Sequence, residues 1–165
     1  MPTDRLATYL NDHLAGAVAA LELLEHLEKQ YAGTPVERFA TGMRVDVEAD
    51  RKELEALARR LGVGESGARK ATAWLAERVA RLKLRLDDPD GGPLRLLESV
   101  EVLALGIDGK RALWASLAAA AERGAPGLQG VDYARLAERA DEQRRRAETV
   151  RLDAARAALA APRGS

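Results

Sequence analysis

Two polar side chains fall at positions where the helical periodicity of the sequence places core residues, and two more lie beside one of them. His13 lies near the middle of the apolar face of an expected first helix, and Asp50 lies near the middle of the apolar face of the second. Asp46 and Glu53 flank Asp50. If the turn at Gly33 makes a helical hairpin, residues equidistant from the turn face each other. We therefore expect His13, Asp50 and Glu53 to lie at a similar depth.

Two kinds of chemistry fit this set of residues. A buried aspartate is costly unless it is paired or hydrogen-bonded, and His13 is the obvious partner for Asp50, so the two could form a polar pair that fixes the helix register. Alternatively, His13, Asp46, Asp50 and Glu53 could hold a single metal ion. One imidazole with several carboxylates suits iron, manganese or zinc. The sequence leaves both interpretations open.

A second candidate site is a basic face on an expected helix at residues 66–86. The side opposite its apolar stripe carries one tryptophan among cations: Lys70, Trp74, Arg78, Arg81 and Arg85. Either another helix or a second subunit covers Trp74, or this face binds an anion, a membrane surface or a protein partner. Nucleic acid is disfavoured, because the rest of the chain supplies no basic stripe and the net charge is zero.

Proline and glycine divide the chain into five expected helices that would position these residues. Thr34 and Pro35 form a helix start, and the stretch DDPDGGP is the strongest break. The expected helices span residues 3–31, 35–61, 66–86, 93–123 and 131–160, all within a single domain, 1–165. Short loops make sequential helices antiparallel neighbours.

Periodicity at 100° per residue also predicts which face of each helix is buried. The first helix has the face Leu6, Leu10, Ala17, Leu21, Leu24 and Tyr31. The second has the face Phe39, Met43, Val47, Leu54, Leu57 and Leu61. The last has the face Tyr133, Leu136, Ala140, Ala147, Ala154 and Ala158, with Gln143 at its edge. The helix at 93–123 is apolar nearly all round, which predicts deep burial.

Composition favours an all-α protein and excludes several function classes. The chain has 33 alanines and 25 leucines but only 10 valines and one isoleucine, so helix formers dominate. Because it has no cysteine, thiol chemistry, disulfides and cysteine-ligated metals are excluded. There is no signal peptide pattern and no apolar run near the roughly 20 residues that span a bilayer. We therefore expect a cytoplasmic protein without a transmembrane segment.

Long antiparallel helices with inward carboxylates and a histidine resemble the ferritin-like superfamily. The resemblance implies an antiparallel four-helix bundle, here with an additional fifth helix. Bundles of that family hold two metals with a Glu from each of two helices and Glu-x-x-His from each of two others. In this chain, Leu10 precedes His13 by three residues and Leu23 precedes His26, so the Glu-x-x-His motif is absent. The resemblance thus implies the architecture without the di-iron centre.

No motif in the chain indicates a reaction, and the stretch GVGESGARK lacks the form of a phosphate-binding loop. We therefore expect a non-enzymatic helical bundle that acts as a binding or scaffold protein, without a cofactor. Its partner would be a second copy of itself or another protein. The alternative is a metal-binding, ferritin-like redox or storage protein with a mononuclear or degenerate site for Fe, Mn or Zn.

Overall fold

The helices of the structure begin and end close to the expected positions. The computed structural model describes residues 4–64, 77, 80 and 92–160. These contain the helices α1 (Asp4–Gln30), α2 (Pro35–Arg60), α4 (Gly92–Glu122) and α5 (Tyr133–Leu159), and within these ranges there is no strand. None of the four helices is both long and apolar enough to cross a membrane. Apart from residues 77 and 80, which are helical, the expected helix at 66–86 lies outside the described residues.

Side chains cap the starts of two helices. The Thr34 hydroxyl accepts a hydrogen bond from the Val36 amide at 3.2 Å, and Pro35 occupies the first turn of α2, as expected. The Asp132 carboxylate accepts a hydrogen bond from the Arg135 amide at 3.0 Å. This cap makes α5 begin two residues later than the sequence periodicity predicts.

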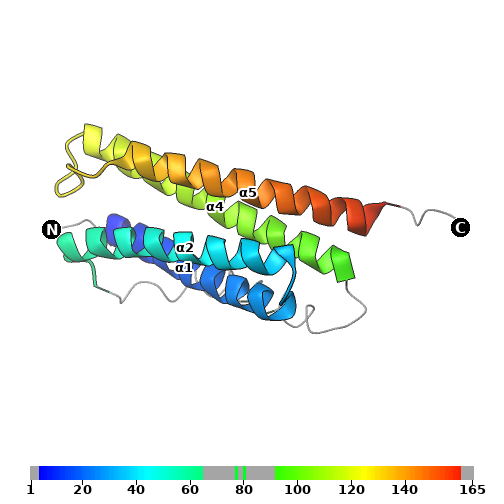
Figure 1. Cartoon of the computed structure of the whole chain (residues 1–165). Coiled ribbons are helices and arrows are strands. Elements are labelled where there is room, and N and C mark those ends of the chain that lie inside the picture. Colours follow the sequence, from blue (N-terminus) through cyan, green and yellow to red (C-terminus); the bar gives the residue numbers. More distant parts are fainter. Residues whose placement is uncertain (1–3, 65–76, 78–79, 81–91, 161–165) are drawn as a thin grey trace, which may run out of the picture.

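The four helices form two antiparallel hairpins that stack on each other, α1 with α2 and α4 with α5 (Figure 1). Between the hairpins, α1 lies beside α4 and α2 lies beside α5. All neighbouring helices run in opposite directions, and α2 and α4 run in the same direction. Packing is closer within each hairpin than between the hairpins. The expected all-α fold is therefore confirmed for the described residues.

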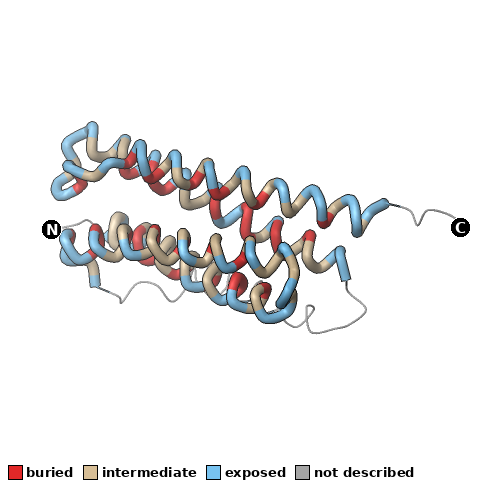
Figure 2. The backbone as a smooth tube through the Cα atoms, viewed as in Figure 1, coloured by how far each residue is buried: buried red, intermediate tan, exposed pale blue. Residues whose placement is uncertain are grey.

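Two apolar clusters fill the space between the hairpins, where Figure 2 shows the buried backbone. One cluster includes Met43 and Val47, and the other includes Leu54 and Trp114. Along α2, Asp50 lies between the residues of the two clusters. A polar position therefore separates two apolar regions of the core.

The buried faces of α2 and α5 largely follow the expected periodicity. In α2 they are Ala40, Met43, Val47, Asp50, Leu54, Leu57 and Ala58. In α5 they are Tyr133, Leu136, Ala140, Gln143, Ala147 and Ala154. Periodicity therefore predicted correctly that Asp50 points into the bundle.

The buried face of α1 matches the expected one at Leu10 and Leu24 but differs from it elsewhere. Residues spaced by four, Ala15, Ala19, Leu23 and Leu27, are buried, whereas His13 is only partly buried. Such a row forms a ridge that packs into the groove of a neighbouring helix, and its two alanines allow a close approach. The expectation that His13 lies at the middle of the buried face is therefore wrong.

Candidate functional site

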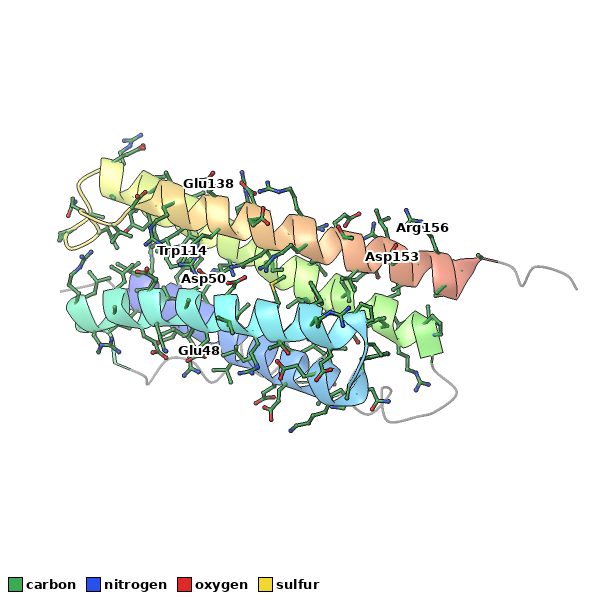
Figure 3. The ribbon with its side chains drawn as sticks, viewed as in Figure 1. Glu48, Asp50, Trp114, Glu138, Asp153 and Arg156 are labelled. Carbon is green, nitrogen blue, oxygen red and sulfur yellow. The ribbon has the colours of Figure 1, made fainter. Side chains whose placement is uncertain are left out.

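The polar centre of the bundle is built around Asp50. This residue is 2% exposed and lies between the two hairpins, as does Trp114 (Figure 3). Its Oδ2 atom accepts hydrogen bonds from Lys110 Nζ at 2.5 Å and from Gln143 Nε2 at 2.7 Å. Lys110 Nζ also donates to Gln143 Oε1. Side chains from α2, α4 and α5 therefore close a triangle of hydrogen bonds inside the core.

A second cation faces the other oxygen of Asp50. Arg139 Nη2 lies 3.0 Å from Asp50 Oδ1 and forms an ion pair with it. This contact lacks the geometry of a hydrogen bond, so Asp50 Oδ1 has no hydrogen-bond partner among the described residues. One carboxylate thus faces two cations, Lys110 and Arg139, and the cluster has a net positive charge.

Burial makes the charged form of Lys110 less favourable. Its side chain is 16% exposed, and removal from water lowers the pKa of this ammonium group below its usual value. The neighbouring Asp50 carboxylate acts in the opposite direction. Asp50 therefore offsets part of the desolvation cost of Lys110, and the contacts with Gln143 and Arg139 add to the stability of the buried cluster.

The other two acids that the sequence singled out on α2 also meet cations from α5. Asp46 forms an ion pair with Arg146. Glu53 forms one with Arg135 at 2.9 Å. Each of these acids is more than a third exposed. The acidic face of α2 is thus the surface on which α5 docks.

His13 lies apart from this network of hydrogen bonds. Its ring packs edge-on against Tyr9, with 4.8 Å between the ring centroids and 77° between the ring planes. Burial lowers the pKa of His13, and the charge of Asp12 acts in the opposite direction. Among the described residues, the hydrogen bonds of Asp50 come from Lys110 and Gln143, not from His13. The expected His13–Asp50 hydrogen bond is therefore replaced, because α4 brings a longer side chain to the same depth.

The described part of the chain contains no group of three His, Cys, Asp or Glu side chains arranged to hold a metal ion. Asp46, Asp50 and Glu53 contact cationic side chains instead. A metal held by these acids and His13 stays a prediction, and it would require those ion pairs to open.

A cavity of about 350 Å³ lies beside the polar centre, between α1, α2 and α4. It is partly open to solvent, and its walls are mostly apolar. Small residues leave the space on both sides: Gly16, Ala17 and Ala20 on α1, and Gly106 and Gly109 on α4. The polar residues that line it are Asp12, His13, Asp50, Arg51, Lys110 and Trp114.

Trp114 contributes an indole N–H that is buried without a partner. The side chain is 1% exposed and lines the cavity one helical turn after Lys110. Its Nε1 atom has no hydrogen-bond partner among the described residues. A buried donor without an acceptor is costly, so an acceptor from outside the described residues would stabilise this position.

The sequence reasoning missed Lys110 and Trp114, although a signal was present. Leu103, Ile107, Lys110, Trp114 and Leu117 follow the alternating spacing of four and three that is typical of a buried helical seam. Lys110 is the one charged member of this series. A charge in such a register predicts a buried partner on another helix.

The second candidate site cannot be placed against this geometry. Its residues, Lys70, Trp74, Arg78, Arg81 and Arg85, lie outside the described residues.

Comparisons of the chain with protein-family models, with curated proteins and with solved structures found no match. Among the described residues, the polar centre and the cavity are the features that bear on function.

Proposed function

We propose that this protein is a non-enzymatic binding protein that holds a small, largely apolar molecule in the cavity between α1, α2 and α4. The observation that carries the proposal is the cavity itself. Its volume of about 350 Å³ falls within the roughly 300–1,000 Å³ that is usual for ligand pockets. Mostly apolar walls with a few convergent polar groups are also typical of such pockets.

The proposed architecture is a ferritin-like bundle without a di-iron centre. The direction of the helices supports this, because α2 and α4 run the same way and one long connection, residues 61–91, separates them. Ferritin-like bundles have one such crossover connection. The ammonium group of Lys110 is held by oxygens of Asp50 and Gln143 from two helices. A lysine thus takes up side-chain oxygens that could otherwise serve a metal in the bundle core.

Binding of a neutral probe, 1-octanol, to the full chain tests the proposed function. We expect octanol to raise the free energy of unfolding, by about 2.7 kcal/mol at a concentration of 100 times its Kd. The variant Gly106→Leu should abolish this effect. Gly106 lines the cavity, and a Cβ atom added there meets no other atom within 4 Å, so a larger side chain has room to start at this position and should narrow the cavity.

The matched control is Ala115→Leu, which adds a leucine to an exposed position of α4 that does not line the cavity. It should bind octanol as the parent does. A parent protein that does not respond to octanol would contradict the proposal, as would a Gly106→Leu variant that responds equally. Elemental analysis of protein purified without chelator tests the metal alternative, and light scattering tests self-association.

A further inference from the structure

We infer that the molecule bound in this cavity carries a carboxylate, which Lys110 and Trp114 hold together. The inference rests on the proposed function, since it names the chemical class of the ligand for the same cavity. It is carried by two neighbouring residues that line the cavity, each with a hydrogen-bond donor that has capacity to spare.

The two donors belong to one face of α4. Lys110 and Trp114 are four residues apart, a spacing that places side chains about 5–6 Å from each other at Cβ. An ammonium group has three donors. Asp50 and Gln143 use two of those of Lys110, which leaves one. The indole N–H of Trp114 is buried, and none of the described residues accepts a hydrogen bond from it.

A carboxylate fits this pair because it has two oxygens with a fixed separation and no donor. One oxygen can accept from the ammonium group and the other from the indole, and hydrogen bonds to an ionised group are stronger than those between neutral groups. A hydroxyl group has a single oxygen and can satisfy both donors less well.

The charges around the cavity favour an anion over a cation. On the lining itself the cations Lys110 and Arg51 balance the acids Asp50 and Asp12, and the excess positive charge comes from Arg139, which pairs with Asp50 without lining the cavity. Arg51 also lines the cavity and pairs with Glu55 at 2.8 Å. The remaining titratable groups on the lining are Asp12, which opposes an anion, and His13, whose pKa is lowered by burial and which therefore adds little positive charge at neutral pH.

The test compares three probes with the same eight-carbon chain: octanoate, 1-octanol and octylamine. Titration calorimetry on the full chain at neutral pH should show octanoate binding about ten- to a hundredfold more tightly than octanol, since one hydrogen bond to a charged group contributes that much. Octylamine should bind more weakly than octanol.

Two variants assign this preference to the two donors. Trp114→Phe keeps an aromatic ring but removes the N–H, and the ratio of octanoate to octanol affinity should fall by about tenfold. Lys110→Met should reduce the ratio further. Lys110→Met could fail to fold because Asp50 loses its partner. In that case the ratio of octanoate to octanol affinity in Trp114→Phe alone still tests the inference. The control Lys29→Met changes an exposed lysine outside the cavity and should leave the ratio unchanged.

Equal affinity for octanoate and octanol would overturn the inference, and so would a preference for octylamine. If Gly106→Leu then still abolishes octanol binding, the proposed function stands and only the carboxylate assignment fails. If none of the three probes binds the parent protein, the proposed function fails as well.

Discussion

Lys110 is the residue on which the buried charge of Asp50 depends most directly. The two atoms Lys110 Nζ and Asp50 Oδ2 are 2.5 Å apart, and Asp50 is almost fully buried. Removal of one partner of a buried ion pair costs about 3–5 kcal/mol, whereas replacement of both by apolar groups is often neutral or better. A double-mutant cycle therefore distinguishes a coupled ion pair from two residues that contribute independently.

We predict that Lys110→Met lowers the free energy of unfolding by about 3 kcal/mol, and that adding Asp50→Leu restores much of the loss. Urea unfolding of the four proteins in the cycle measures the coupling energy. The comparison cycle pairs His13→Leu with Asp50→Leu. Because His13 donates no hydrogen bond to Asp50 and only shares the cavity lining with it, its coupling energy should be smaller than that of Lys110 with Asp50. Strong coupling of Asp50 to His13, with none to Lys110, would show that the hydrogen bonds described here are wrong.

His13 gives the fold a dependence on pH. Burial lowers its pKa below the usual 6.5, so the unfolded chain takes up a proton at a higher pH than the folded chain does. The unfolded state therefore binds more protons below about pH 6.5, and the free energy of unfolding falls as the pH falls through that range. The variant His13→Gln should lose this part of the pH dependence. Urea midpoints between about pH 7 and pH 5 measure it, and an unchanged slope in the variant would refute the role of His13.

At the level of helices, α2 and α5 meet through a row of ion pairs of unequal burial. The outer pairs, Asp46–Arg146 and Glu53–Arg135, are between 36% and 48% exposed, whereas Asp50 in the middle is 2% exposed. Exposed ion pairs contribute little because water and salt screen them. The central residue should therefore dominate the energetics of this interface.

We predict that Asp46→Asn and Glu53→Gln each reduce the free energy of unfolding by about 0.2–1 kcal/mol at low salt. The loss should vanish near 1 M NaCl, where the screening length is about 3 Å. Asp153→Asn is the matched control, because Asp153 pairs with Arg156 of the same helix and both side chains are 71% exposed (Figure 3). A loss that persists at high salt would mean that the outer pairs act as buried ones.

Helical periodicity predicted the bounds of α1, α2, α4 and α5 and the burial of Asp50, because these depend on local spacing and on turn residues. It failed for His13, since α1 has apolar residues on two sides and periodicity alone does not decide which side packs. It also overestimated the burial of α4, where Leu105 is 66% exposed. A helix that is apolar nearly all round has no single face for the pattern to indicate.

The partner of Asp50 could not be predicted from spacing. Lys110 lies 60 residues away along the chain, and Gln143 lies 93 residues away. Periodicity states which side of a helix is buried, but the identity of the helix that covers it depends on the packing of the whole bundle. The symmetry of the α1–α2 hairpin favoured His13 as the partner of Asp50. That reasoning considered α1 and α2 alone and took no account of α4 and α5.

At the scale of the whole molecule, the cavity follows from the way in which the hairpins are built. Each hairpin packs closely on itself, and the contact between hairpins is looser. Glycines and alanines of α1 and α4 line the remaining space, and the polar centre lies at its edge. The indole N–H of Trp114 reports directly on whether an acceptor enters that space.

The most direct test is the nitrogen–proton NMR signal of this indole group. The chain has two tryptophans, so the variant Trp74→Phe leaves Trp114 as the sole source of an indole signal. We predict that octanoate shifts this signal downfield in a saturable manner, and that the shift disappears when Gly106→Leu fills the cavity. A Trp114 signal that stays unchanged when octanoate is added would contradict the account of the cavity as a carboxylate-binding site.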